Sequence, residues 1–337
     1  MTHKPQSSRS HANLAPHERM LGALWGSVVG DALGVPVEFT DRDARRLDSV
    51  VSMRGGGVWR QPPGTWSDDS SLLLCSAESL LDGFDPDDMG RKFVDWLQGK
   101  RWTPWGEVFD IGSTTRRALG EVARGVAAEL AGGITEGSNG NGSLMRIIPV
   151  ALHSTSLPVA GMLERIHRAS AITHRHPRSQ MACGLFSLVA QHLLRGESPV
   201  CAWEASANEF RGQYGAAEWA AERARFDAIL EADLADLPES EIKSDGYVLH
   251  TLAASMWCLL NTESYSEAVL RAVNLGGDAD RTGCVTGGLA GLSYGYSSIP
   301  EEWIATLARR AELDQLFRQF ASIHATSAPN PPGNSQQ

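Results

Sequence analysis

The stretch GALWGSVVGDALG, residues 22–34, carries a glycine at every fourth position of an otherwise mostly apolar segment. Because residues four apart share one face of an α-helix, the spacing predicts a helix over residues 18–33 with a face of small side chains. A neighbouring backbone can approach such a face closely. The segment therefore predicts tight packing of this helix against another element.

Segments rich in Ala and Leu follow, and the alternation typical of strands is scarce. We expect an all-α fold, with many helices packed in one compact globule. Further helices are expected over residues 70–81, 87–98, 114–125, 158–170, 179–195, 216–232, 247–261, 265–273, 282–294 and 300–317. No linker and no repeat divides them. The expected organisation is a flexible N-terminal arm over residues 1–17, one domain over residues 18–320, and a disordered tail over residues 321–337.

The composition excludes several classes of protein. The chain has 337 residues, 42% of them hydrophobic, and a formal net charge of −10. Such an acidic chain does not fit a nucleic-acid binder that acts by counterion release, nor a partner of anionic membrane surfaces. Its five cysteines are far apart and form no CxxC pair, which argues against a disulfide framework or a zinc knuckle. The N-terminus shows no signal-peptide pattern, so a cytoplasmic location is expected.

Two acidic clusters lie in turns that precede apolar segments. Neighbouring carboxylates repel one another unless a helix N-terminus or a cation lies between them. Each cluster alone fits a simple helix cap, whereas two such clusters, each followed by small apolar residues, favour a shared metal site. The candidate ligands are Ser67, Asp68, Asp69, Asp278, Asp280 and Thr282.

These candidate ligands offer only oxygen atoms. Hard oxygen ligands favour Mg²⁺, Mn²⁺ or Ca²⁺ over zinc. Four carboxylates also carry more charge than one divalent ion needs, so the site has room for more than one ion.

Three further acids have two interpretations each. Asp31 and Glu38 come at the C-terminal end of the first expected helix, where the helix dipole disfavours carboxylates, so they are either an exposed pair or acids that face a site. Asp110 precedes the helix expected from residue 114. By residue type alone it is a helix cap rather than a site acid.

Two loops contain candidate ligand-binding residues. The backbone amides of NGNGSLMR, residues 139–146, can hold phosphate oxygens and Arg146 can add positive charge, although a plain turn fits the same residues. The stretch THRHP, residues 173–177, contains His174 and His176. Their spacing gives little support for zinc, and capping or surface histidines fit as well as ligand contact.

Taken in order, these motifs resemble the ADP-ribosylglycohydrolase family, over residues 18–317. The matching motifs are Gly26-x-x-x-Gly30-Asp31-Ala32-Leu33-Gly34 with Glu38, Ser67-Asp68-Asp69, Asp110-Ile111-Gly112, Asn141-Gly142-x-x-Met145-Arg146, Thr173-His174 and Gly277-Asp278-x-Asp280. The resemblance implies an all-α fold with two magnesium or manganese ions. The implied metal ligands are Ser67, Asp68, Asp69, Asp278 and Asp280.

One position departs from the family's pattern. Arg281 stands where the family has a hydroxyl residue, so either Thr282 replaces it or one ion is weakly held. The resemblance also implies that ADP-ribose binds in a cleft lined by His174 and the Asn-Gly loop. The loop's contact residues would be Asn141, Gly142, Ser143 and Met145. Glu38 and Asp110 are expected near the scissile bond, together with Asp69 as a catalytic carboxylate.

The implied activity is hydrolysis of the bond between ADP-ribose and a modified protein side chain, most simply arginine. The transition state of such a reaction resembles an oxocarbenium ion. Asp110 and Glu136 are acids that could pair with the guanidinium of that arginine. The alternative is a binding or immunity protein that neutralises an ADP-ribosyltransferase toxin by occlusion, as well as or instead of hydrolysis, with the N-terminal arm as one contact.

Overall fold

The computed structural model describes residues 14–231 and 233–325. Within these residues the regular structure is helical, and β-pairing is limited to isolated bridges. The α-helices are α1 (Pro16–Gly34), α2 (Arg42–Leu47), α3 (Asp68–Ser79), α4 (Pro86–Leu97), α5 (Ser113–Ala123), α6 (Ala128–Ala131), α7 (Ile148–His153), α8 (Val159–Ala171), α9 (Pro177–Leu194), α10 (Pro199–Gln213), α11 (Ala220–Arg223), α12 (Asp227–Leu230), α13 (Val248–Leu260), α14 (Tyr265–Asn274), α15 (Ala279–Tyr294), α16 (Glu301–Thr306) and α17 (Arg310–His324). The expected all-α fold class is confirmed.

The helices differ from the expected ones in several places, and α2, α6 and α7 were not expected. Helix α10 was not expected, although Ser198 accepts a hydrogen bond from the backbone N–H of Cys201 and Pro199 occupies the first turn, which together are a strong N-terminal signal. The helix expected over residues 216–232 is broken into short turns, α11 and α12 among them. The helix expected over residues 300–317 is divided because Arg309 takes a left-handed conformation with φ of 48°.

The ends of the domain lie outside the expected boundaries. Helix α1 begins at Pro16 and α17 continues through His324, past the boundaries expected at residues 18 and 320. Residues 1–13 of the expected arm and 326–337 of the expected tail lie outside the described residues.

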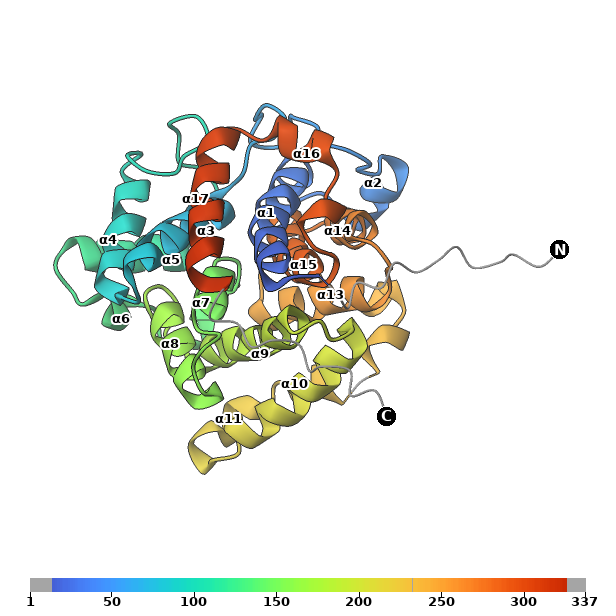
Figure 1. Ribbon diagram of the computed structural model, residues 1–337. Coiled ribbons are helices and arrows are strands. Elements are labelled where there is room, and N and C mark those ends of the chain that lie inside the picture. The colour runs from blue at the N-terminus through green and yellow to red at the C-terminus, as the bar shows by residue number, and fades with distance from the viewer. Residues whose placement is uncertain (1–13, 232, 326–337) are drawn as a thin grey trace.

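Helices α1 and α15 form the centre of the molecule and cross at a face made of glycines (Figure 1). A Cβ atom added at Gly26 would lie 2.3 Å from the carbonyl oxygen of Gly287, and one at Gly30 would lie 2.0 Å from that of Gly283. These distances leave no room for a side chain, so the glycine spacing of α1 is needed for the contact. The predicted close approach of another backbone is confirmed.

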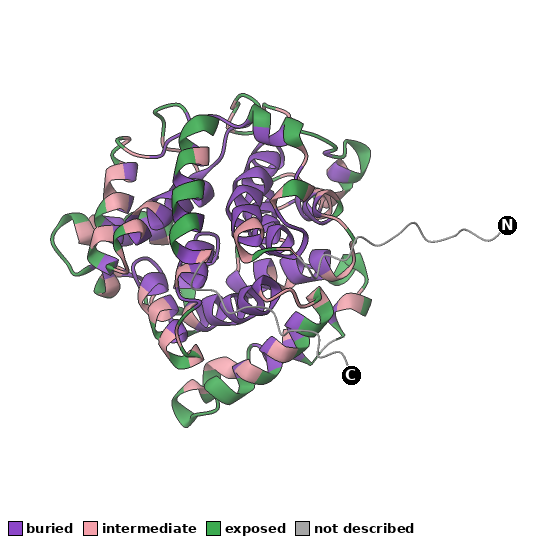
Figure 2. Cartoon of the chain, in the orientation of Figure 1, coloured by how far each residue is buried: buried purple, intermediate pink, exposed green. Residues whose placement is uncertain are grey.

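Other helices cover this central pair. Helices α3, α9, α13 and α14 pack against α15, and α17 packs against α1. Figure 2 shows α1 and α15 as almost entirely buried, whereas α17 and α10 expose one face to solvent. Asp31, in the last turn of α1, and Asp280, in the first turn of α15, therefore lie at the ends of two buried helices.

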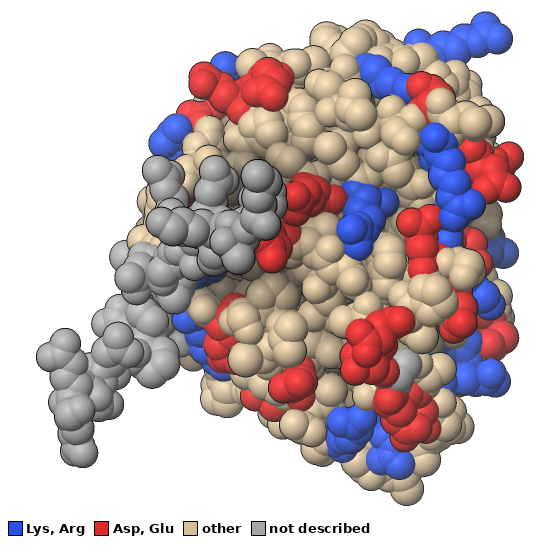
Figure 3. Space-filling model, turned by 90° about the vertical axis from the view of Figure 1, so that its right-hand side faces the viewer, with Lys and Arg blue, Asp and Glu red and all other residues tan. Residues whose placement is uncertain are grey.

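Among the described residues, one helical segment is long and apolar enough to cross a membrane. This segment, residues 16–37, contains α1, and its apolar window is wholly buried inside the domain. Its apolar character is therefore explained by its place in the core. On the face shown in Figure 3, acidic and basic side chains are interspersed.

The glycine contact gives a stability prediction. We expect Gly26→Ala to lower the free energy of unfolding by about 2–3 kcal/mol, because the added methyl group forces α1 and α15 apart. Gly120→Ala in α5 is the matched control, since a Cβ there meets nothing within 4 Å. It should raise stability by up to about 1 kcal/mol through helix propensity. Urea unfolding followed by circular dichroism compares them, and equal midpoints would contradict the packing account.

Candidate functional site

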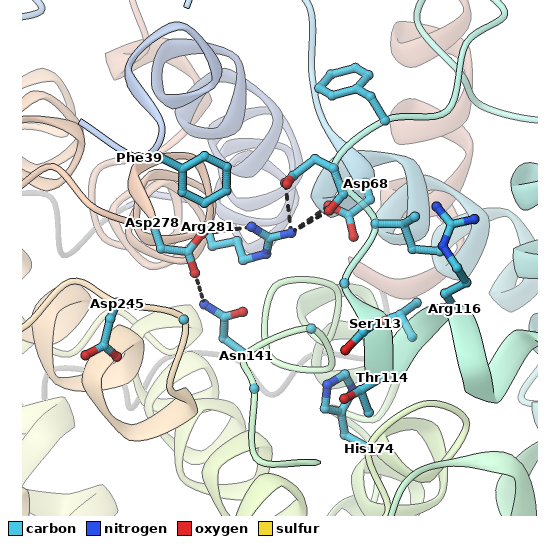
Figure 4. A pocket seen from close by; sticks show the side chains of 18 of the residues that line it. Phe39, Asp68, Ser113, Thr114, Arg116, Asn141, His174, Asp245, Asp278 and Arg281 are labelled. Atoms are coloured by element: carbon cyan, nitrogen blue, oxygen red, sulfur yellow. Dashed lines mark hydrogen bonds and ion pairs between the residues drawn. The ribbon is translucent and has the colours of Figure 1, made fainter. Parts of the chain in front are cut away.

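A cleft of about 770 Å³ is lined by the N-terminal ends of α3, α5 and α15 and by the loops that contain Phe39, Asn141 and Asp245. Asp68 at the start of α3, and Asp278 and Arg281 at the start of α15, line its floor. Figure 4 shows Arg281 reaching across the cleft toward Asp68, with Asn141 beside Asp278. The two acidic clusters that are far apart in the sequence therefore meet in one site.

Asp31 of α1 fixes the first of these clusters. Its carboxylate accepts hydrogen bonds from the backbone N–H groups of Ser67 and Ser70, at 3.0 Å each, and from the Ser70 hydroxyl at 2.5 Å. Ser67 in turn caps α3 by accepting from the backbone N–H of Asp69. A carboxylate buried at the end of α1 thus sets where α3 begins. Asp31 is fully buried, so the exposed-pair interpretation is wrong for this residue.

The second cluster sits in the turn before α15. Gly276 and Gly277 have φ of 72° and 67°, which favours glycine, and they reverse the chain so that Asp278 begins the helix. A Cβ at Gly34 would lie 2.3 Å from the Cα of Asp280. The C-terminal end of α1 is therefore pressed against the first turn of α15, which brings Asp280 close to Asp31.

Arg281 is the cation at the centre of the site. It is 8% exposed, and its guanidinium lies 2.8 Å from Asp278, 2.9 Å from Asp68 and 2.8 Å from Asp110. Glu38, Asp69 and Asp280 lie at 3.3, 3.4 and 3.8 Å. Burial acts to lower the pKa of Arg281, but these carboxylates outweigh it and raise the pKa well above its usual range. The guanidinium is therefore charged and surrounded by acids.

Arg281 does not satisfy all of these acids. The carboxylate oxygens of Asp69 and Asp280 are fully buried and accept no hydrogen bond from any described residue. Together with Asp31, they place three carboxylate oxygens within 4.8 Å of one another. Unpaired buried carboxylates are costly, and a divalent ion bound by oxygen ligands would satisfy them. The residues at this position therefore fit a metal ion.

Burial also affects protonation in the site. It raises the pKa of Asp68, Asp69 and Asp280 well above their usual range, and raises that of Asp31 to about 6. The same cause raises the pKa of Glu38 to about 8, and the Asp110 carboxylate adds to the effect. Without a metal ion, burial therefore favours the protonated forms of these acids.

Glu38 and Asp110 contact different nitrogens of the Arg281 guanidinium, Nη1 and Nη2 respectively. Glu38 accepts a hydrogen bond of 2.5 Å from the indole N–H of Trp59 and is buried. Asp110 has φ of 58°, and both its carboxylate and its carbonyl oxygen contact Arg281. Gly112, not Asp110, is the N-cap of α5, so the helix-cap interpretation of Asp110 is wrong.

The Asn-Gly loop contributes only part of what was expected. The Asn141 amide donates to Asp278 at 2.6 Å, and Gly142 and His174 line the cleft. Burial lowers the pKa of His174 to about 3, so this ring is neutral. By contrast, the Ser143 hydroxyl contacts Ser170 and Cys183 within the core.

Three further residues do not face the acids. Met145 is buried in the hydrophobic core, so neither it nor Ser143 lines the cleft. The Thr282 hydroxyl donates to the carbonyl oxygen of Asp278, along its own helix, and its role as a metal ligand stays a prediction. Glu136 pairs with Arg178 at 2.6 Å, which leaves it committed to a partner in the chain.

Sequence reasoning missed the aromatic wall of the cleft. The rings of Phe39, Trp59 and Phe109 form a connected group, with centroids 6.5 Å and 5.5 Å apart. All three line the cleft, and Phe39 is 62% exposed. The three rings come from separate segments of the chain, so no local pattern in the sequence marks this wall.

The comparisons with known proteins agree with this geometry. The model of the ADP-ribosylglycohydrolase family matches residues 12–330. The ADP-ribosylarginine hydrolase Tri1 of Serratia proteamaculans is 31% identical over 94% of this chain and 84% of its own length. The ADP-ribosyl-[dinitrogen reductase] glycohydrolase of Rhodospirillum rubrum is 30% identical over 92% of this chain and 96% of its own.

A solved structure also matches. It is described as an ADP-ribosylglycohydrolase-related protein complex and is 34% identical, with a TM-score of 0.78 over 92% of this chain and 99% of that one. The resemblance inferred from the motifs is confirmed. The chain belongs to the ADP-ribosylglycohydrolase family and is a glycohydrolase.

Proposed function

We propose that this protein releases ADP-ribose from arginine side chains of modified proteins, with the help of a divalent metal ion. The observation that carries the proposal is the group of fully buried carboxylate oxygens of Asp69 and Asp280, which accept no hydrogen bond from the described residues. They belong to the same acidic cluster as Asp68 and Asp278, which line the cleft. Such oxygens are stable only beside a cation or a proton. A catalytic site is a common place for such an arrangement.

We propose Mg²⁺ or Mn²⁺ as the ion. Its nearest ligands would be Asp31, Asp69 and Asp280, whose donor atoms are all oxygens. The family resemblance implies two ions, and a second group of Glu38, Asp278 and Asp280 has the same spacing. When bound, an ion would hold the ribose hydroxyls and lower the pKa of a bound water.

The cleft offers distinct surfaces for the parts of ADP-ribose. Ser113 and Thr114 begin α5 at the cleft, where a helix N-terminus favours phosphate oxygens. Gly142 and His174 lie nearby and leave space for the sugar. The Phe39 and Phe109 rings offer an apolar wall on which an adenine base could stack.

The reaction adds a water oxygen to C1″ of the distal ribose and breaks the bond from C1″ to the guanidine nitrogen. The leaving nitrogen takes up a proton, while the attacking water loses one. Glu38 is suited to donate a proton, because burial raises its pKa to about 8. Asp69 is suited to orient the water. Asp110 is suited to stabilise positive charge, since its carboxylate lies at the cleft.

Similarity and charge support the proposed arginine linkage. The Tri1 proteins of Serratia proteamaculans and Pseudomonas putida, both named as ADP-ribosylarginine hydrolases, are 31% identical to this chain. Asp245 lines the cleft and is exposed, so it can pair with a substrate guanidinium. We place the activity in the cytoplasm, where the proposed protein substrates would be encountered.

A second function is favoured by Arg281. A guanidinium already inside the acidic cluster suits a protein that binds ADP-ribosylated targets or blocks an ADP-ribosyltransferase toxin by occlusion. The Asp69→Asn variant separates the two functions. If this variant loses hydrolysis yet still protects cells from a cognate transferase, occlusion operates. If protection disappears with hydrolysis, the enzymatic function alone accounts for it.

The metal proposal predicts a chelation and rescue pattern. Exhaustive chelation should abolish release of ADP-ribose, and Mg²⁺ or Mn²⁺ should restore it while Zn²⁺ does not. Asp69→Asn and Asp280→Asn should each lower turnover by about a hundredfold or more. The exposed Asp82→Asn is the control and should be unaffected. Full activity in the chelated protein would rule out a metal role.

The same variants give a stability readout. Without metal, Asp69→Asn should be at least as stable as the unaltered protein, because it removes a buried carboxylate whose oxygens accept no hydrogen bond. Adding Mn²⁺ at about a hundred times its dissociation constant should stabilise the unaltered protein by about 2.7 kcal/mol and the variant much less. Thermal unfolding with and without Mn²⁺ measures this difference, and equal stabilisation of both would contradict the ligand assignment.

The linkage is tested on defined peptides. We expect faster release of ADP-ribose from a modified arginine peptide than from a serine peptide of the same sequence, because Asp245 and Asp110 favour a departing guanidinium. Chromatography of released ADP-ribose measures both rates, with Asp69→Asn as the background. A preference for the serine peptide would overturn the arginine assignment.

A further inference from the structure

The structure contains two overlapping groups of carboxylates with the spacing of a metal site. One consists of Asp31, Asp69 and Asp280, and the other of Glu38, Asp278 and Asp280. All five side chains are buried. The two groups differ in how the guanidinium of Arg281 contacts them.

The guanidinium enters the second group directly. A single nitrogen of Arg281, Nη1, lies 2.8 Å from Asp278, 3.3 Å from Glu38 and 3.8 Å from Asp280. The other terminal nitrogen, Nη2, bridges Asp68 and Asp110. The guanidinium thus contacts every member of the second group with one atom, as a bound cation would.

The first group is left without such a partner. All four oxygens of Asp69 and Asp280 are buried and accept no hydrogen bond from the described residues. Arg281 approaches Asp69 only through Nε, at 3.4 Å. Asp280 is shared by both groups, so the contrast lies in their other members. Arg281 donates hydrogen bonds to Asp278 and Glu38 of the second group, whereas the oxygens of Asp69 in the first group accept none.

We propose that the guanidinium of Arg281 is a built-in replacement for the second metal ion, so that the chain binds one divalent ion and not two. This inference rests on the proposed metal-dependent hydrolysis. The ion occupies the group of Asp31, Asp69 and Asp280. Arg281 supplies one permanent positive charge to the other group, which chelators cannot remove because the charge is part of the chain.

The replacement has a chemical consequence. A guanidinium can donate hydrogen bonds but has no vacant orbital for a water or a ribose hydroxyl. At the second position, the protein therefore holds the substrate by hydrogen bonds and charge, and Lewis-acid chemistry is restricted to the first position.

The test is a count of bound Mn²⁺ per chain, by native mass spectrometry and titration calorimetry of the full-length protein. We expect one Mn²⁺ in the unaltered protein and two in Arg281→Thr, which opens the second group. Arg281→Lys keeps a positive charge at the position and should bind one. Arg116→Thr is the matched control, since it removes an exposed arginine from the same cleft and should also leave one.

Each outcome decides the matter. Two ions in the unaltered protein, or only one in Arg281→Thr with native circular dichroism, would overturn the replacement while leaving metal-dependent hydrolysis intact. If Arg281→Thr does not fold, the counts for the unaltered protein and Arg281→Lys still decide, because two ions in either overturns the proposal. No bound ion together with activity that resists chelation would instead overturn the proposed function itself.

Discussion

The close backbone contact between the glycines of α1 and α15 is the constraint on which the site depends. Because Gly26 and Gly30 let the two backbones touch, the end of α1 reaches the first turn of α15. Asp31 then lies beside Asp280, and its hydrogen bonds to the backbone of Ser67 and Ser70 determine where α3 begins. The carboxylates come from three helices, yet one packing contact brings them together.

Charge balance is the second organising principle. The site gathers more buried carboxylates than its arginine can neutralise, so the metal-free state must hold protons or a cation. Burying a charge stabilises a fold only when the charge is paired. The acidic cluster therefore contributes little to stability without its cation. We interpret the arrangement as one retained for catalysis, in keeping with a family of glycohydrolases.

Much of the fold could be predicted from the sequence, because glycine spacing and helix caps are local signals. Of the site, the two acidic clusters near Ser67 and Asp278 could be predicted, because each lies in a turn that precedes an apolar segment. The site was less predictable where packing between distant segments decides which way a side chain points. Ser143 and Thr282 have suitable hydroxyls, but their side chains bond to the core and to the helix backbone. The aromatic wall around Trp59 has no local pattern at all.

The central claim is that the acidic cluster contains two cation positions, one for a divalent ion and one filled by Arg281. Anomalous diffraction at the manganese edge, from crystals grown with Mn²⁺, tests it most directly. The account predicts one peak per chain, among the oxygens of Asp31, Asp69 and Asp280, with the Arg281 guanidinium still beside Asp278. Two peaks with the arginine turned out of the cluster, or no peak among those three carboxylates, would contradict it.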